Sequence, residues 1–415
     1  MNLLHLIYDL LLRLTWWSLH LAALFSTKMK LFVTGRKKSK NIIKSLDETN
    51  DKWIWMHVAS LGEYEQGVPI LKQIRLTYPS HKLVLTFFSP SGYEVKKKSS
   101  LADLILYLPM DTLSNAKQFL DSLNPDLAIF IKYEIWPNYL RELKQRNIPT
   151  LLVSAIFSKR QVFFKPWGSF MRKSLNAFTH FFVQDENSKL LLKSLGHQNL
   201  VVSGDTRFDR VSEILVQHNQ LDFMDGFKQN HLCFVAGSTW PEDEQILTAY
   251  INASSHQVKF VLAPHTIKPA HIEKIKESIG KAVICYSEIK AGDDLSTYDV
   301  LIVDTIGLLT KIYSYANVAY VGGAFATGLH NTLEPAVFGI PVIIGPDYSG
   351  FKEAEDLVDK KGICVVQNES EFKSLLDQLV LDESYRKQTG EINSLYIKQN
   401  VGATSKVMEL IKSIL

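Results

Sequence analysis

The feature that most constrains the fold of this chain is a long series of short, continuous apolar segments. They begin at about residue 51 and recur through both halves of the 415-residue sequence, separated by stretches of helical pattern. They lack alternation with polar residues, which is typical of strands buried on both faces of a parallel sheet. The sequence therefore predicts an α/β protein built from βαβ units. The predicted strands are 53–58, 82–88, 127–131, 150–156, 180–184, 200–204, 232–237, 259–264, 282–287, 299–304, 318–323, 341–345 and 362–367.

A polar stretch divides this series in two. Residues 205–230 carry no strand pattern, although predicted strands precede and follow them. A chain of 415 residues is long for one domain, because domains usually hold about 100–200 residues. We therefore expect two doubly wound sheets of similar size, in residues 41–212 and 213–415, preceded by a distinct segment, residues 1–40.

The N-terminal segment is apolar and then basic. Residues 2–26 have about the length needed to span a bilayer, but four polar residues interrupt them: His5, Asp9, Arg13 and His20. A basic stretch follows, with Lys28, Lys30, Arg36, Lys37, Lys38 and Lys40. Such a flank marks the cytoplasmic side of a membrane and binds anionic headgroups.

Three interpretations of residues 2–26 stay open. They are a spanning or deeply inserted anchor, an amphipathic helix in the membrane interface, or a buried core helix. The first two place the remainder of the chain in the cytoplasm against a membrane. A cleaved secretory signal is not expected, because no charged segment precedes the apolar run and no small-residue cleavage site follows it.

Composition excludes several classes of protein. Hydrophobic residues make up 46% and charged residues 21%, as in folded globular proteins and unlike disordered or polytopic membrane chains. The net charge of +3 argues against a protein that coats nucleic acid. The 3 cysteines are far apart, so neither a disulfide framework nor a structural metal site is expected.

Ligands of open parallel sheets bind beyond the carboxyl ends of the strands, so the residues after each predicted strand are the candidates for chemistry. Ser60, Gly62 and Glu63 follow the first strand. Gly62 permits a tight turn, and Glu63 falls in the first turn of the next helix. Glu63 is either a general base that faces a cleft or one half of a capping box with Ser60.

Two further loops of the first half carry candidate cleft residues. Ser91 and Glu94 follow the second strand with the spacing of a capping box, so Ser91 is either a cap or a cleft residue. Glu134 follows the third strand next to Trp136 and Pro137. It is either a solvated charge or a carboxylate in the cleft, while Pro137 suits the first position of a helix.

In the second half, Ser238 and Thr239 lie in a turn of small residues that leads into a helix. Backbone N–H groups at such a turn can bind phosphate, although a helix cap is the alternative. The Walker A and GxGxxG patterns are absent. His265 and Lys268 follow the next strand and could neutralise a phosphate or a carboxylate, or belong to a solvated loop.

The most informative segment is residues 321–335. Its glycines, among them Gly322 and Gly323, let the backbone approach a ligand closely. His330 and Asn331 offer polar groups at a predicted helix start, and Glu334 follows one turn later. A carboxylate there can accept both hydroxyls of a ribose. The alternative is a glycine turn followed by a capped helix.

Taken together, these residues resemble the 3-deoxy-D-manno-octulosonic acid (Kdo) transferases of lipopolysaccharide assembly. The resemblance covers nearly the whole chain. It rests on Ala59–Glu63, Glu134–Asn138, Gln184, Gly204, Phe208, Asp209, Gly237–Thr239, Asp304–Leu308, Gly322, Gly323 and the string His330-Asn331-x-Leu333-Glu334-Pro335.

The resemblance implies a membrane-anchored GT-B glycosyltransferase with two Rossmann-like domains facing a cleft. Such an enzyme moves Kdo from CMP-Kdo to the lipid A precursor (lipid IVA), with inversion, at the cytoplasmic face of the inner membrane. Glu63 would be the general base, with Ser60, Gly62, Ser91 and Glu134 on the acceptor side. The donor residues would be Ser238, Thr239, His265, Lys268, Gly322, Gly323, His330, Asn331 and Glu334. No metal, no resident cofactor and no nucleic-acid partner is expected.

Two departures from the family pattern concern charged groups. The family usually has Pro-Arg-His where this chain has Pro264-His265-Thr266, so His265 or Lys268 would have to replace the arginine. The family usually has Glu-Thr-Glu where this chain has Lys132-Tyr133-Glu134, so only the second carboxylate is present.

Other functions remain compatible with the sequence. The nearest is another GT-B nucleotide-sugar enzyme, either a different lipid glycosyltransferase or an epimerase. A two-domain solute-binding protein and a membrane-tethered scaffold are more distant alternatives, and binding of CMP would distinguish both from the transferases.

Overall fold

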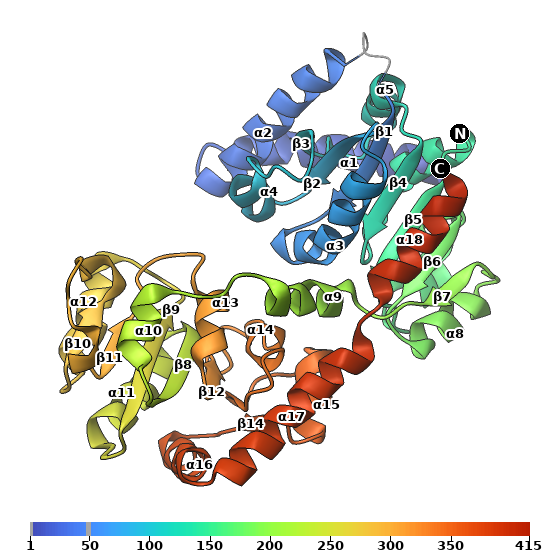
Figure 1. Cartoon of the computed structure of the whole chain (residues 1–415). Coiled ribbons are helices and arrows are strands. Elements are labelled where there is room, and N and C mark those ends of the chain that lie inside the picture. The colour runs from blue at the N-terminus through green and yellow to red at the C-terminus, as the bar shows by residue number, and fades with distance from the viewer. Residues whose placement is uncertain (1–2, 47–50) are drawn as a thin grey trace. The chain divides into compact units, whose positions relative to one another are not determined.

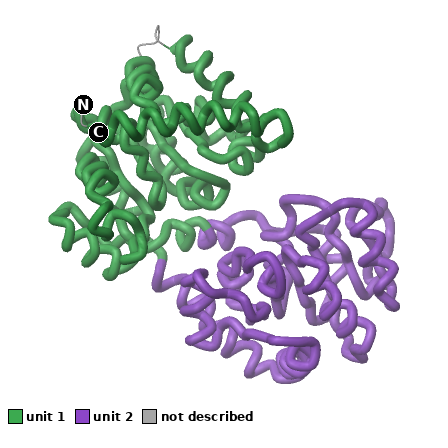
Figure 2. The backbone as a smooth tube through the Cα atoms, turned by 180° about the vertical axis from the view of Figure 1, so that it is seen from behind, with its two compact units in different colours: residues 1–210, 401–415 green, residues 211–400 purple. Residues whose placement is uncertain are grey.

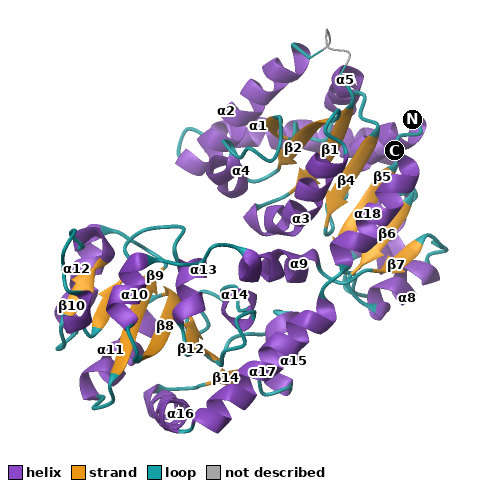
Figure 3. Ribbon diagram, in the orientation of Figure 1, coloured by secondary structure: helices purple, strands orange, loops and turns teal. Residues whose placement is uncertain are grey.

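Parallel seven-stranded sheets form the centre of both halves of the chain. The structure is a computed structural model that describes residues 3–46 and 51–415. It divides into unit 1, residues 1–210 with 401–415, and unit 2, residues 211–400 (Figure 2). Helices cover the faces of each sheet (Figure 3). The predicted α/β class and the parallel sheets are therefore confirmed.

The sheet of unit 1 has the strand order β3-β2-β1-β4-β5-β6-β7, with every pair parallel. Its strands are β1 (Trp53–Val58), β2 (Lys82–Phe87), β3 (Leu104–Tyr107), β4 (Leu127–Ile131), β5 (Thr150–Ala155), β6 (His180–Val183) and β7 (Leu200–Val202). Its helices are α1 (Leu3–Ala22), α2 (Thr27–Lys44), α3 (Leu61–Thr77), α4 (Pro90–Lys96), α5 (Leu113–Leu123), α6 (Pro137–Gln145), α7 (Ser169–Leu175), α8 (Glu186–Ser194) and α18 (Ala403–Ile414), with 3₁₀ turns at Val162–Phe164 and Pro166–Gly168.

Alternate residues of the central strands supply two separate cores. Trp55 of β1 and Phe130 of β4 pack on one face of the sheet, whereas Met56 and Ile129 pack on the other. This is the period-two geometry of a strand, and every residue of β1 and β4 is buried. Burial on both faces explains why these strands read as continuous apolar runs.

Unit 2 repeats the architecture with the strand order β10-β11-β9-β8-β12-β13-β14. Its strands are β8 (Leu232–Thr239), β9 (Val258–Pro264), β10 (Val283–Cys285), β11 (Val300–Ile302), β12 (Val318–Val321), β13 (Val342–Ile344) and β14 (Ile363–Val365). Its helices are α10 (Asp222–Lys228), α11 (Pro241–Ala253), α12 (Pro269–Ser278), α13 (Leu309–Ile312), α14 (Leu333–Ala336), α15 (Lys352–Asp359), α16 (Glu369–Leu381) and α17 (Glu383–Asn400). The 3₁₀ turns lie at Glu213–Val216, Tyr286–Glu288, Leu295–Thr297 and Tyr313–Tyr315, and α9 (Thr206–Ser212) crosses from unit 1 into unit 2.

The C-terminal segment differs from the sequence-based division, which assigned residues 213–415 to the second domain. Residues 401–415 belong to unit 1, where α18 lies beside α3 (Figure 1). Val407, Met408 and Ile411 of α18 complete the apolar core under that face of the sheet. Both oxygens of Asp209 accept hydrogen bonds at the start of α18, from the backbone N–H groups of Gly402 and Thr404 at 2.6 and 2.7 Å.

The N-terminal helix α1 presents many apolar side chains to its surroundings. None of its residues is buried, which is contrary to the alternative of a buried core helix. Trp17 is 76% exposed and Leu21 is 63% exposed. In residues 3–46 and 51–415, no helix is both long and apolar enough to span a membrane. Membrane anchoring by residues 1–40 stays a prediction.

Hydrogen bonds from two neighbouring residues attach α1 to the body of unit 1. The Tyr8 hydroxyl donates to Oδ2 of Asp111 at 2.9 Å, and the backbone N–H of Leu113 donates to Oδ1 of Asp9 at 2.7 Å. Asp111 is buried and also accepts from the backbone N–H groups of Asn138 and Tyr139 in the first turn of α6. This one carboxyl group therefore joins two helices.

The buried Asp111 predicts a pH dependence of stability. Burial raises its pKa from 3.8 to about 7, against the opposing effect of the hydrogen bonds that it accepts. A carboxyl with a raised folded-state pKa contributes stability that is fully present below about pH 4 and is lost as the pH rises to about 7. At 1.36 kcal/mol per pKa unit the loss is at most about 4 kcal/mol. Asp111→Asn should remove this decline, measured as melting temperature against pH. An equally steep decline in the variant would contradict the assignment.

Candidate functional site

Glu63 lies in the first turn of α3, directly after the carboxyl end of β1. Its Oε2 accepts a hydrogen bond from the Ser60 backbone N–H at 3.0 Å and another from the Ser60 hydroxyl. Its Oε1 is 3.9 Å from Nζ of Lys132, and the side chain is 12% exposed. The carboxylate thus caps α3 at the edge of the sheet where ligands of this fold class bind. The capping interaction predicted as one interpretation of Glu63 is therefore present, and the role of Glu63 as general base stays a prediction.

Glu134 belongs to a buried polar cluster that the sequence did not predict as a unit. Its Oε2 is 3.1 Å from Nε2 of His57 and accepts from the Trp136 indole N–H at 3.0 Å. Nδ1 of His57 lies 2.8 Å from the hydroxyl of Thr86. The Trp136 indole N–H and the adjacent His57 ring therefore hold Glu134 in place, so it is not a solvated surface charge.

Ser91 has a different local role from the predicted cap. The N-cap of α4 is Ser89, whose hydroxyl accepts the Ser91 backbone N–H at 3.2 Å. Ser91 itself is exposed within the first turn. Glu94 accepts from Lys97 and from the Tyr107 hydroxyl instead of closing a capping box. The predicted Ser91–Glu94 box is wrong because the helix begins two residues earlier than such a box requires, at Pro90 with Ser89 as its N-cap.

In unit 2, the carboxyl end of β8 has an unusual backbone, and Ser238 and Thr239 are the last two residues of this strand rather than the turn predicted after it. Ser238 has a φ of 55°, in the left-handed region that residues other than glycine rarely adopt. The pairing of β8 with β9 is irregular at the same point. Thr239 is buried and its hydroxyl donates to Glu244 at 3.1 Å. Of the two residues predicted to contact phosphate, Thr239 therefore has its hydroxyl engaged within the protein.

The adjacent glycines Gly322 and Gly323 follow β12 and are required by their neighbours. A Cβ on Gly323, whose φ is 101°, would lie 2.3 Å from the Gly328 carbonyl oxygen. A Cβ on Gly322 would lie 2.5 Å from the Ser238 carbonyl oxygen. Protein atoms therefore exclude a side chain at both positions. The two glycines let the end of β8 pack against the loop after β12, and this packing alone requires them.

Asp243 joins these two loops. It is buried in the first turn of α11, and its oxygens accept from the backbone N–H groups of Trp240 at 2.8 Å and Gly323 at 2.9 Å, and from the Tyr320 hydroxyl at 2.6 Å. Burial raises the pKa of Asp243, and these donors oppose that rise. Asp243 was not predicted from the sequence, because Trp240 at the start of the helix is not a capping-box residue.

Three rings stack at the carboxyl ends of β8, β9 and β12. The centroids of Trp240 and His265 are 4.7 Å apart, and those of His265 and His330 are also 4.7 Å apart. The Trp240 indole N–H donates to Nε2 of His330 at 3.0 Å. Burial, and secondarily the neighbouring His265, lowers the pKa of His330, which favours its neutral form as the acceptor. Two predicted donor residues thus form one aromatic platform.

Glu334 and Asn331 also lie together. Glu334 accepts from the Asn331 side-chain amide at 3.0 Å and from the Thr310 hydroxyl at 3.1 Å. Lys268 is the exposed N-cap residue of α12 and forms no ion pair within the described parts of the chain. The predicted donor residues therefore gather at one edge of the unit 2 sheet, after β8, β9 and β12 and around α14.

Comparison with known proteins identifies relatives. Residues 30–210 match a family model described as 3-deoxy-D-manno-octulosonic-acid transferase (kdotransferase). The chain is 29% identical to the 3-deoxy-D-manno-octulosonic acid transferase of Aquifex aeolicus over 83% of this chain and 92% of that protein. It is 28% identical to the Rickettsia bellii protein of the same name over 91% of each. The resemblance that the sequence motifs indicated is confirmed.

Solved structures give the fold. UDP-GlcNAc 2-epimerase from Neisseria meningitidis aligns with a TM-score of 0.63 at 15% identity, covering 87% of this chain and all of that chain. Identity this low establishes similarity of fold alone. With the two parallel sheets, it confirms the predicted two-domain GT-B fold.

Proposed function

Because this chain is a relative of the Kdo transferases with their domain in residues 30–210, we propose that it transfers Kdo from CMP-Kdo to the lipid A precursor lipid IVA. The observation that carries this proposal is the similarity to those transferases over both units. The acceptor is a membrane lipid, so the reaction is proposed to occur at the cytoplasmic face of the inner membrane, with the N-terminal segment as the membrane contact.

In the proposed reaction a hydroxyl oxygen of the acceptor attacks the anomeric carbon of Kdo. A new carbon–oxygen bond forms on one face while the bond to CMP breaks on the other, and CMP leaves with the bonding electrons. The configuration at that carbon is inverted. Glu63 takes the proton of the attacking hydroxyl, since an alcohol is a weak nucleophile until a base removes its proton in the transition state.

The arrangement around Glu63 supports the role of base. Ser60 fixes one carboxylate oxygen, and the other lies toward the positive charge of Lys132. The side chain remains 12% exposed, so it is not enclosed by packed protein. A carboxylate that is oriented by a hydrogen bond and remains partly exposed supports the proposal that Glu63 takes the proton.

In unit 2 we propose that the residues at the sheet edge bind CMP-Kdo. The Trp240–His265–His330 stack offers flat surfaces, and Glu334 offers an acceptor for ribose hydroxyls. Either Lys268 or His265 would take the place of the family arginine next to the donor carboxylate or phosphate.

The direct test is to incubate the purified protein with CMP-Kdo and lipid IVA and measure product mass. An increase of one or more Kdo units with release of CMP is expected. Product formation from a UDP-sugar, with none from CMP-Kdo, would favour another GT-B enzyme and contradict the proposal.

Glu334→Ala is expected to weaken CMP binding by about 10–100-fold, because a hydrogen bond to a charged group contributes about 1.5–3 kcal/mol. Isothermal titration calorimetry measures this directly. Glu391→Ala, which removes an exposed carboxylate elsewhere in unit 2, is the matched control and should leave CMP affinity unchanged. Unaltered affinity in Glu334→Ala would remove that residue from the donor site.

A further inference from the structure

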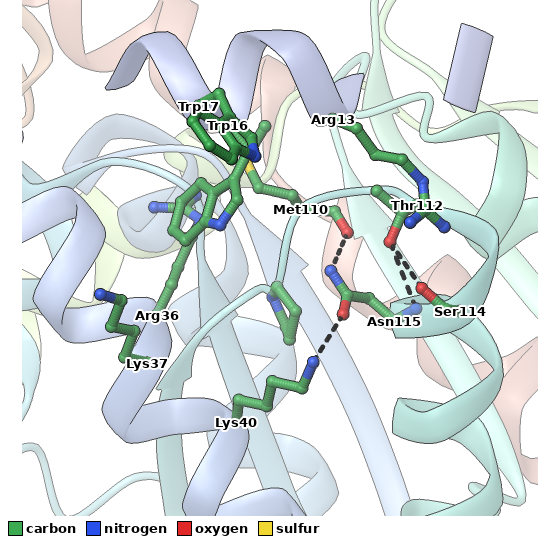
Figure 4. Close-up of a pocket in the computed structure, with 11 residues that line it drawn as sticks. Arg13, Trp16, Trp17, Arg36, Lys37, Lys40, Met110, Thr112, Ser114 and Asn115 are labelled. Carbon is green, nitrogen blue, oxygen red and sulfur yellow. Dashed lines mark hydrogen bonds between the residues drawn. The ribbon is translucent and has the colours of Figure 1, made fainter. Parts of the chain in front are cut away.

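A cavity of about 460 Å³ lies in unit 1 among α1, α2 and the start of α5 (Figure 4). Arg13, Trp16 and Trp17 contribute from α1, and Lys37 and Lys40 contribute from α2. Asn115 of α5 closes another side, where its side-chain oxygen accepts from Lys40 at 3.4 Å. None of the residues predicted for sugar transfer lines this space.

The lining is cationic. Arg13, Arg36, Lys37 and Lys40 line the cavity, and no Asp or Glu does so. Within the described residues, Arg13 pairs with Asp9 at 2.7 Å, whereas neither lysine forms an ion pair with a carboxylate. Four cations around one space repel one another, so an anion inside it would be stabilised by all of them.

Arg36 adds an independent indication of an anionic ligand. Its side chain is buried, and its guanidinium donates to the carbonyl oxygens of Phe32 and Phe88. Its Nε has no hydrogen-bond partner among the described residues. Burial lowers the pKa of Arg36 to about 9, and no carboxylate among the described residues offsets that effect. The rings of Phe32, Phe88 and Tyr107 stabilise part of this charge, with the nearest centroid 3.5 Å from Cζ of Arg36. An anion in the adjacent cavity would supply the counter-ion that these rings do not.

The other side of the cavity is apolar and continues onto the surface of α1. Trp16 and Trp17 line it, and the exposed side chains of Leu10, Leu14 and Leu21 lie on the same helix. Tryptophan is favoured where apolar and polar surroundings meet at a membrane. A ligand that fits both sides carries a phosphate at one end and hydrocarbon at the other.

We propose that this cavity binds the phosphate of one anionic phospholipid, with Arg13, Lys37 and Lys40 around the phosphate and the acyl chains along Trp17 and the exposed leucines of α1. The proposal goes beyond sugar transfer, because it assigns a second ligand to a site apart from Glu63 and the donor residues. Its test is a binding measurement in the absence of CMP-Kdo, so its failure is distinguishable from failure of the proposed reaction.

The experiment titrates the full-length protein with monomeric dihexanoyl phosphatidic acid and measures affinity by calorimetry. The double variant Lys37→Gln/Lys40→Gln is expected to bind at least about tenfold more weakly, since each lysine near a lipid phosphate contributes about 1 kcal/mol. The matched control is Lys28→Gln/Lys38→Gln, which removes two exposed lysines from the same helix outside the cavity. It should bind as the unaltered protein does.

A second variant tests the space rather than the charge. Ser114 lines the cavity and is exposed, so Ser114→Trp should fill it and weaken binding while every cation remains. Equal losses in the two lysine pairs would mean only diffuse surface attraction and would overturn the proposal. So would absence of binding, or inorganic phosphate binding as tightly as the lipid. Binding of lipid IVA without binding of phosphatidic acid would overturn the assignment to a phospholipid.

Discussion

Replacing Glu63 with glutamine is expected to lower kcat by about 10²–10⁴-fold, the usual contribution of a positioned general base. Glutamine keeps an oxygen that can accept the Ser60 backbone N–H, as the glutamate does at 3.0 Å. The local fold should therefore survive while the ability to take a proton is lost. The measurement is initial rate with CMP-Kdo and lipid IVA, with CMP affinity measured separately and expected to be unchanged.

The contribution of Glu63 to helix capping must be separated from its contribution to chemistry. Ser60→Ala removes the hydroxyl that contacts Glu63 but leaves the carboxylate. Loss of a cap costs about 0.5–2 kcal/mol of stability, so this variant should melt earlier and retain far more activity than Glu63→Gln. Near-normal turnover in Glu63→Gln, or an equal loss of activity in both variants, would refute the assignment of the base.

The second large effect is expected at Asp243. Asp243→Ala leaves the Trp240 and Gly323 backbone N–H groups and the Tyr320 hydroxyl without their acceptor. Because hydrogen bonds to charged groups contribute about 1.5–3 kcal/mol each, we expect a loss of at least about 3 kcal/mol in the free energy of unfolding, measured with urea. CMP binding should also weaken, because the loops after β8 and β12 are no longer joined.

Glu242→Ala is the matched control for Asp243→Ala. Glu242 occupies the same turn of α11 but is exposed. Its removal should cost less than about 1 kcal/mol, the size of an interaction with the helix dipole. If both variants lose similar stability, Asp243 does not act as the link between the two loops.

Most of the fold could be predicted because strands that are buried on both faces consist of continuous apolar residues. Strands such as β1 and β4 are covered on both faces, so their apolar runs stand out from the surrounding helices. The short edge strand β3 was missed because its 4 apolar residues, Leu104–Tyr107, are too few to stand out from the neighbouring helical patterns. The return of α18 to unit 1 could not be predicted. The amphipathic pattern of a helix indicates that one face is buried, but it does not indicate which of the two sheets that face packs against.

The candidate site was predictable in part and for a different reason. Residues that follow strands, such as Glu63 and Glu334, could be identified because the carboxyl ends of parallel strands define one edge. His57 and Asp243 were missed, since His57 lies within an apolar strand and Asp243 looks like an ordinary first-turn acid. Their hydrogen-bond partners, Glu134 and Gly323, are distant in sequence. Such contacts depend on tertiary structure, so no fixed spacing in the sequence indicates them.

The position of α18 has a consequence for synthesis of the chain. Unit 2 is one continuous stretch, residues 211–400, and can complete its folding as soon as that stretch has left the ribosome. Unit 1 cannot, because Val407, Met408 and Ile411 of its core are translated after the whole of unit 2. The half of the protein that emerges first is therefore the half that finishes last, and it must remain incompletely packed while nearly two hundred further residues are added.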